Sequence, residues 1–425
     1  MLIIEKADKV FGTISVPGDK SISHRAVMLG AIGQGKTVIE GFLNGQDCLS
    51  TIGCFRAMGI GIELMGQKVE VEGKGLLGLK EPSDILDAGN SGTTMRLIMG
   101  ILSGQNFLSL ITGDQSLRQR PMARVADPLR AMGANIDGRE DGRFAPLVIR
   151  GGDLKGITWK TPVASAQIKS AILLAGLYAK GSTTVIEPII SRDHTERMLS
   201  CFGISVERSG AAVTIKPGML EAQNISVPGD ISSAAFFIVA AAVKPGAHLI
   251  IKNVGLNPTR TGIIDAMRQM GADIEIDNIH QLAGEEAGDI IVRGSELHGT
   301  EILGEMVPRL IDEIPVLAVA AALAEGVTYI RGASELKVKE SNRLTAIVVE
   351  LQKMGVQIAE LPDGLKIVGS NKLHGASINS YHDHRIAMAM AVCGLFAEGK
   401  TIIADSACID ISFPGFGELL HQIVR

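Results

Sequence analysis

Helical segments that are apolar on every side recur along this 425-residue chain. Each is followed by a Gly and a short β-branched strand, and all but the last lead to an amphipathic helix that ends at Met-Gly or Phe-Gly. A helix without a polar stripe belongs in a core, and short β-branched strands are typical of half-buried sheets. The period of roughly 70 residues therefore predicts about six α/β units, the last incomplete. The apolar helices are expected at 21–31, 93–102, 166–178, 232–243, 314–324 and 385–396.

One short motif occurs twice. Ile-Ser-Val-Pro-Gly-Asp stands at 14–19 and again at 225–230, each time before an apolar helix. The duplication predicts a two-domain, inside-out α/β barrel fold with buried helices, outer sheets and three repeated units per domain. One domain is expected at 18–226, and the other at 1–17 plus 227–425. Two crossings at Pro-Gly steps favour a hinge, and a cleft between domains is a common ligand site.

Composition excludes several classes of protein. The chain is 46% hydrophobic, which is too apolar for a disordered protein, and its net charge of -5 argues against nucleic-acid binding. Its five Cys include no C-x-x-C pair, so we expect neither a disulfide framework nor a Cys-based zinc site. The apolar runs at 234–243 and 316–324 are shorter than the roughly 20 residues of a membrane helix, and no signal peptide is visible. We therefore expect a cytoplasmic protein that binds no nucleic acid and no membrane.

The starts of the apolar helices are polar, and several carry cations. Free backbone N–H groups and the helix dipole make such a start an anion site. If the starts converge, an acidic protein would hold a cationic cleft suited to a small polyanion. Simple N-capping by Ser21, Ser165 or Ser232 explains each start taken singly. The segments are 20–25, 89–93, 165–167, 230–233, 312–313 and 382–385.

Other motifs carry less weight. Residues 30–37 fit the P-loop pattern, but the expected helix precedes the Gly-Lys-Thr step instead of following it. Residues 73–78 fit G-x-G-x-x-G, yet Pro82 follows where a helix should begin. His382 and His384 do not share a helix face, which disfavours a metal site. The acidic segment 284–289 is expected to be a solvated loop.

Six segments match one known set of motifs in order: 17–25, 86–96, 120–121, 165–167, 338–343 and 383–385. This set resembles the 5-enolpyruvylshikimate-3-phosphate synthase family. The resemblance spans nearly the whole chain and implies two inside-out α/β domains that close around the substrates. It implies transfer of the enolpyruvyl group of phosphoenolpyruvate to the 5-hydroxyl of shikimate 3-phosphate, with release of phosphate. It also implies a monomer with no metal and no organic cofactor.

The resemblance assigns roles by position. The residues implied to hold phosphoenolpyruvate are Lys20, Arg120, Gln167, Arg343 and Arg385, with Asn90 and Gly92 lining its pocket. Those implied to hold shikimate 3-phosphate are Ser21, Arg25, Ser165, Gln167, Ser191 and Arg192, with Asp312 and Lys339 at its ring hydroxyls.

Asp312, Glu340 and Lys20 are the candidate catalytic groups, with Asp312 as the base toward the 5-hydroxyl. A carboxylate among cations stays ionised, so Glu340 as an acid needs burial or a relay through Lys20. The assignment of each proton stays open.

This chain departs from some family members at three places. Ala166 stands where they carry Ser, His194 stands where they carry Tyr, and residues 411–414, beginning with Ile411, stand where they carry a Lys near the C-terminus. Arg192 is the alternative phosphate contact. A UDP-amino-sugar enolpyruvyl transferase shares the fold but carries a reactive Cys on a mobile loop, and 118–124 contain none. A non-catalytic metabolite-binding protein would not require Asp312, Lys339 and Glu340 together with the arginines.

Overall fold

The computed structural model describes residues 1–282, 284–370 and 372–424. It divides the chain into two compact units, which we name unit 1 and unit 2. Unit 1 comprises Met1–Pro17, Pro228–Gln281 and Glu286–Arg425, and unit 2 comprises Gly18–Val227 and Leu282–Glu285. No helix within the described residues is both long and apolar enough to cross a membrane.

Unit 2 contains three four-stranded sheets, ordered β14-β3-β5-β4, β6-β7-β9-β8 and β10-β11-β13-β12. Its helices are α1 (Lys20–Ile32), α2 (Gln46–Ala57), α3 (Gly92–Leu102), α4 (Ala123–Met132), α5 (Arg139–Gly142), α6 (Ala166–Gly176) and α7 (His194–Cys201). Its strands are β3 (Gln34–Glu40), β4 (Gly61–Met65), β5 (Lys68–Lys74), β6 (Leu86–Asp87), β7 (Leu108–Thr112), β8 (Asn135–Gly138), β9 (Phe144–Arg150), β10 (Thr158–Lys160), β11 (Thr183–Ile186), β12 (Val206–Ser209), β13 (Ala212–Ile215) and β14 (Asn224–Ser226).

Unit 1 contains sheets ordered β16-β17-β15-β2, β18-β19-β21-β20 and β1-β23-β22. Its helices are α8 (Ile231–Ala242), α9 (Gly262–Gln269), α10 (Met306–Leu310), α11 (Ile314–Leu323), α12 (Arg343–Lys353), α13 (His384–Gly394) and α14 (Phe416–Ile423). Its strands are β1 (Leu2–Ile4), β2 (Phe11–Ser15), β15 (His248–Gly255), β16 (Asp273–Leu282), β17 (Glu285–Arg293), β18 (Glu301–Ile302), β19 (Val327–Ile330), β20 (Gln357–Leu361), β21 (Gly364–Val368), β22 (Ser377–Ile378) and β23 (Thr401–Ile403).

The six predicted apolar helices are confirmed as α1, α3, α6, α8, α11 and α13, with ends shifted by at most two residues. Every residue of α8 is buried. Inside unit 2, α1 and α6 pack against α3, and inside unit 1, α8, α11 and α13 pack against one another. Each unit has its own apolar core. The helices therefore lie inside and the sheets outside, as the all-round apolar pattern predicts.

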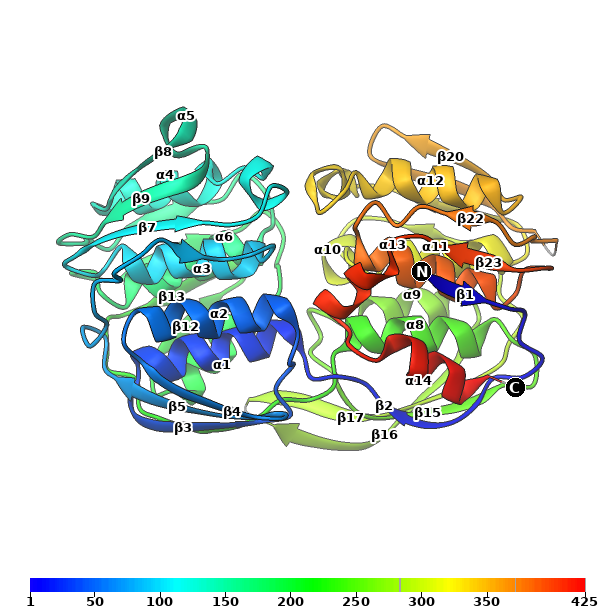
Figure 1. Ribbon diagram of the computed structural model, residues 1–425, viewed down its shortest axis with the longest axis horizontal. Coiled ribbons are helices and arrows are strands. Elements are labelled where there is room, and N and C mark those ends of the chain that lie inside the picture. The colour runs from blue at the N-terminus through cyan, green and yellow to red at the C-terminus, as the bar shows by residue number, and fades with distance from the viewer. Residues whose placement is uncertain (283, 371, 425) are drawn as a thin grey trace. The chain divides into compact units, whose positions relative to one another are not determined.

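The complete repeat is strand, buried helix, strand, outer helix and hairpin, which closes a four-stranded sheet. The last repeat is incomplete, and the N-terminal strand β1 pairs antiparallel with β23 in its sheet (Figure 1). The two copies of the duplicated motif exchange their strands. β2 precedes α1 in the chain but pairs with β15, whereas β14 precedes α8 but pairs with β3.

The duplicated Pro-Gly-Asp has a specific role at each start. The Asp19 carboxylate accepts from the Ile22 N–H and Asp230 accepts from the Ser232 N–H, so these aspartates, and not Ser21 or Ser232, are the N-caps. A Cβ at Gly18 would lie 1.9 Å from the Gly41 carbonyl oxygen, so only glycine fits there.

The expectation of a solvated acidic loop at 284–289 is wrong. Residues from Glu285 onward form β17, and both Glu285 and Asp289 are buried. Asp289 lies 2.7 Å from Lys252 Nζ, and Glu285 lies 2.7 Å from His194 Nδ1. These partners are distant in the sequence, so a local count of acidic residues could not reveal them.

Candidate active site

The start of α1 carries three of the predicted site residues. Lys20 Nζ lies 3.1 Å from Asp47 Oδ2. The Arg25 guanidinium is buried and donates to the Ser21 carbonyl at 3.0 Å and to the Thr195 hydroxyl at 2.6 Å. Burial lowers the pKa of Arg25 to about 10, although Glu196 and Asp19 oppose the shift.

Two arginines, Arg96 and Arg120, lie at the start of α3. Arg120 Nη2 donates to Asn90 Oδ1 at 2.8 Å, and Arg96 Nη1 donates to Gln167 Oε1 at 2.6 Å. Gln167 donates in turn to the Thr93 hydroxyl at 3.0 Å, which connects the starts of α3 and α6. A Cβ at Gly92 would lie 2.8 Å from Arg96 Nη1 and 3.5 Å from Arg120 Nη1. Two guanidinium groups beside a partly buried backbone turn suit an anion.

A buried ion network lies behind the start of α6. Lys169 Nζ lies 2.7 Å from Glu187 Oε2 and 2.9 Å from Glu196 Oε1, and all three side chains are almost fully buried. Glu187 accepts from the backbone N–H groups of Ser165 and Ser191 and from the Ser191 hydroxyl. Ser165 is also the N-cap of α6, accepting from the Ile168 N–H. Two predicted phosphate-site serines are thus held by one carboxylate.

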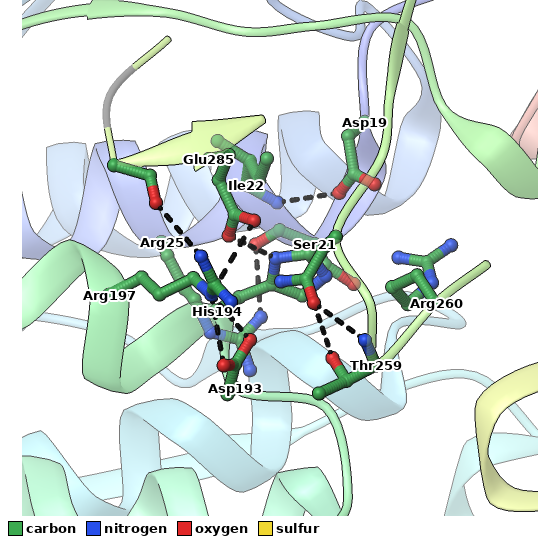
Figure 2. A network of polar contacts seen from close by, with 12 residues as sticks. Asp19, Ser21, Ile22, Arg25, Asp193, His194, Arg197, Thr259, Arg260 and Glu285 are labelled. Atoms are coloured by element: carbon green, nitrogen blue, oxygen red, sulfur yellow. Dashed lines mark hydrogen bonds and ion pairs between the residues drawn. The ribbon is translucent and has the colours of Figure 1, made fainter. Parts of the chain in front are cut away.

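His194, at the start of α7, is also buried. Its Nδ1 lies 2.7 Å from Glu285 Oε1, and Arg197 Nε lies 2.9 Å from Asp193 Oδ1 (Figure 2). Arg192 lies close enough to Arg25 to lower its pKa. The place where some family members carry Tyr therefore holds an imidazole bound to a carboxylate.

A chain of hydroxyl groups connects α1 with the N-cap of α3. His24 Nδ1 lies 2.7 Å from Thr51 Oγ1, which lies 2.7 Å from Thr94 Oγ1. Thr94 donates to the Ser91 hydroxyl at 2.7 Å, and Ser91 accepts from the Thr94 N–H as the N-cap. Burial, with the charges of Lys20 and Arg25, lowers the pKa of His24 well below 6.5. His24 is therefore a neutral, buried support for the start of α3.

The buried His24 predicts a specific pH dependence of stability. Below pH 6.5 the unfolded chain binds a proton at His24 that the folded chain cannot bind, so stability falls as the pH falls. Asn at position 24 can still hydrogen-bond to Thr51, but it does not titrate. From pH 6.5 downward, the wild-type free energy of unfolding in urea should decrease relative to His24→Asn by up to about 1.4 kcal/mol per pH unit. Parallel pH profiles for the two proteins would refute the assignment.

In unit 1 the centre of the site is Arg343, whose side chain is 1% exposed. Its guanidinium donates to Asp383 Oδ2 at 2.8 Å, to Asp312 Oδ1 at 3.2 Å and to Glu340 Oε2 at 2.5 Å. Burial disfavours its charge, but Asp383, Glu340 and Asp312 outweigh burial and raise the pKa of Arg343. Lys339 Nζ also lies 3.3 Å from Asp312 Oδ1. The predicted residues 312, 339, 340 and 343 therefore lie together.

The three buried helices of unit 1 begin at one polar network. Arg385, in the first turn of α13, donates to the Asp312 carbonyl at 3.1 Å and lies 3.9 Å from Glu313 Oε1. Glu313, the residue before α11, accepts from the hydroxyl of Ser232 in the first turn of α8. Arg260 donates to the same hydroxyl at 2.7 Å. The helix starts thus converge within unit 1. In unit 2, the Gln167–Thr93 hydrogen bond and the chain from His24 through Thr51 to Thr94 connect the starts of α1, α3 and α6.

Several supporting residues escaped the sequence analysis. They are acidic and basic partners of residues at the helix starts: Asp47, Lys169, Glu187, Glu196 and Arg260. Lys169 did carry a signal, because a charge inside an apolar helix requires a buried partner. Within the described residues, no three His, Cys, Asp or Glu side chains are grouped so that they could hold a metal ion.

The chain resembles known proteins over its full length. A family of EPSP synthases (3-phosphoshikimate 1-carboxyvinyltransferases) matches residues 4–420. A 3-phosphoshikimate 1-carboxyvinyltransferase of Alkaliphilus metalliredigens is 60% identical over 425 residues, which cover 100% of both chains. One of Brevibacillus brevis is 57% identical over 424 residues, again covering 100% of each chain. The structure of EPSP synthase from Acinetobacter baumannii matches with a TM-score of 0.89 and 46% identity, covering 100% of this chain and 98% of that one. With its convergent cationic helix starts and matching motifs, the chain belongs to the EPSP synthase family of enolpyruvyl transferases.

Proposed function

We propose that this chain transfers the enolpyruvyl group of phosphoenolpyruvate to the 5-hydroxyl of shikimate 3-phosphate, as a 3-phosphoshikimate 1-carboxyvinyltransferase. The observation that carries the proposal is the cluster in which Asp312, Lys339 and Glu340 lie together around the buried Arg343. A binding protein for anions needs cations, but it does not need carboxylates placed among them. A transferase that must remove and deliver protons needs both.

The substrate contacts are proposed in two groups. The cluster of Asn90, Gly92, Arg120 and Gln167 suits phosphoenolpyruvate, with Lys20, Arg343 and Arg385 as further cations. The start of α6 and the residues before α7 suit the phosphate of shikimate 3-phosphate. The residues of this second group are Ser21, Arg25, Ser165, Gln167, Ser191 and Arg192, with Asp312 and Lys339 at the ring hydroxyls.

The proposed reaction is an addition followed by an elimination. Asp312 takes the proton of the 5-hydroxyl while its oxygen bonds to C2 of phosphoenolpyruvate, and a proton is added to the methylene carbon. The resulting tetrahedral intermediate then loses phosphate and a methyl proton, which restores the double bond. Lys20 and Glu340 are proposed to move the protons at that carbon, and the arginines stabilise the charge of the intermediate.

Phosphate release tests the proposal directly. With phosphoenolpyruvate and shikimate 3-phosphate together, the purified protein should release one phosphate for each enolpyruvyl ether formed. No release, while a known enolpyruvyl transferase is active in the same buffer, would refute the proposal. A UDP-amino sugar should not replace shikimate 3-phosphate, and turnover with that acceptor would favour the rival transferase. A monomeric state, a cytoplasmic location and closure of the 18–226 domain on the other domain stay predictions.

A further inference from the structure

We propose that Glu187 is a positioning residue that holds Ser165 and Ser191 from behind, so that Ser165, and not Ser191, donates a hydrogen bond to the phosphate of the substrate. The inference rests on the proposed function, because it concerns the site proposed for shikimate 3-phosphate. It refines the role of Ser191 from a direct contact to a support.

Glu187 joins two segments that are remote from each other in the chain. It directly follows β11, and its Oε1 lies 3.1 Å from the Ser165 backbone nitrogen and 2.6 Å from Ser191 Oγ. Its Oε2 lies 3.2 Å from the Ser191 backbone nitrogen and 2.7 Å from Lys169 Nζ. One carboxylate thus fixes the N-cap of α6 and the segment that leads to α7.

The two serines differ in the hydrogen-bond donors that they can offer to a phosphate. An ionised carboxylate only accepts, so Ser191 gives both its hydroxyl proton and its N–H to Glu187. A phosphate group also only accepts, and Ser191 has no donor left for it. Ser165 differs, because its hydroxyl oxygen accepts from the Ile168 N–H and no described residue accepts its proton. Ser165 is also partly exposed, whereas Ser191 is buried.

The charge balance permits a carboxylate at this place. An uncompensated Glu187 would repel a phosphate, but Lys169 lies within ion-pair distance of both Glu187 and Glu196. Lys169 also donates to the Ser191 carbonyl at 3.3 Å. The second carboxylate, Glu196, raises the pKa of the neighbouring Arg25 and so favours its charged form. The two cations balance the two carboxylates, so Glu187 supplies geometry without net negative charge.

The test compares Ser165→Ala, Ser191→Ala and Glu187→Gln with wild type. Shikimate 3-phosphate binding is measured by calorimetry without phosphoenolpyruvate, and KM is measured for each substrate. Ser165→Ala should weaken binding about tenfold, as expected for a lost hydrogen bond to a charged group. Ser191→Ala should change it less than about threefold. Glu187→Gln should raise KM for shikimate 3-phosphate about tenfold while KM for phosphoenolpyruvate changes less than about twofold, a split that a general loss of stability would not produce.

Two further variants sharpen the result. Glu207→Gln is the matched control, because Glu207 lies in the same sheet as β11 but pairs with Lys216 at the surface. It should leave both KM values unchanged. Adding Ser191→Ala to Glu187→Gln should not weaken the binding of shikimate 3-phosphate further, because Ser191 acts through Glu187.

The inference would be overturned if Ser191→Ala and Ser165→Ala weakened the binding of shikimate 3-phosphate equally. It would also be overturned if the effects of Ser191→Ala and Glu187→Gln on that binding were additive in the double variant. A wild-type protein that releases no phosphate and binds no shikimate 3-phosphate would overturn the proposed function, and the inference with it. If the wild-type protein is active but the two serine variants do not differ as predicted, the inference is refuted and the proposed function stands.

Discussion

Replacing Asp312 with asparagine is expected to lower turnover by about 10²-fold or more, while the protein stays folded. Asp312 is the proposed base toward the 5-hydroxyl, and asparagine has nearly the same shape but cannot take the proton. The amide oxygen can still accept from Lys339 and Arg343, whose donors lie 3.3 and 3.2 Å from Oδ1. Phosphate release at saturating concentrations of both substrates measures the effect.

Lys20→Ala should lower turnover to a similar degree.

Asp273→Asn is the matched control for Asp312→Asn. Asp273 also lies in unit 1 and pairs with an arginine, Arg293 at 3.2 Å, but its side chain is 55% exposed. Its replacement should leave turnover within about twofold of wild type, because exposed ion pairs contribute little. Turnover of Asp312→Asn equal to that of the control would refute the role assigned to Asp312.

Arg343→Met is expected to have the largest effect on stability. It removes the charge that compensates Asp383, whose side chain is fully buried, and leaves Asp312 and Glu340 close to each other. Breaking a buried pair by removing one partner costs about 3–5 kcal/mol. The free energy of unfolding should fall by that amount, and phosphate release should be lost. Circular dichroism in urea is a suitable measurement, because the single tryptophan, Trp159, lies in unit 2.

Arg293→Met provides the comparison for Arg343→Met. Arg293 also pairs with two carboxylates, Asp273 and Glu275, but its side chain is 41% exposed. Its removal should cost no more than about 1 kcal/mol. A similar decrease in the free energy of unfolding for the two variants would show that burial does not govern the contribution of Arg343 to stability.

The sequence predicted the buried helices well because their signal is local. Ile231–Ala242 has no polar stripe that could face water, so its burial follows from composition alone. The supporting charges could not be predicted in the same way. Lys169 clearly needs a partner inside its apolar helix, but Glu187 and Glu196 are selected from many acidic residues only by the packing of α6, β11 and α7.

The N-caps also show that the sequence alone does not decide which side chain takes a given role. A serine at the start of an apolar helix indicates a cap, and Ser165 is one. Ser21 and Ser232 have the same setting in the sequence, yet Asp19 and Asp230 take that role. Ser232 instead donates to Glu313, a contact that depends on how α8 and α11 pack. Residue type therefore located the helix starts, and tertiary packing decided what each side chain does there.

The most direct test of the account is a crystal structure of the protein with shikimate 3-phosphate and a phosphoenolpyruvate analogue bound. The account predicts the ester phosphate within hydrogen-bond distance of Ser165 and Arg25, and a ring hydroxyl on Asp312. The analogue should contact Arg120. A shikimate 3-phosphate bound away from the starts of α1 and α6 would contradict it.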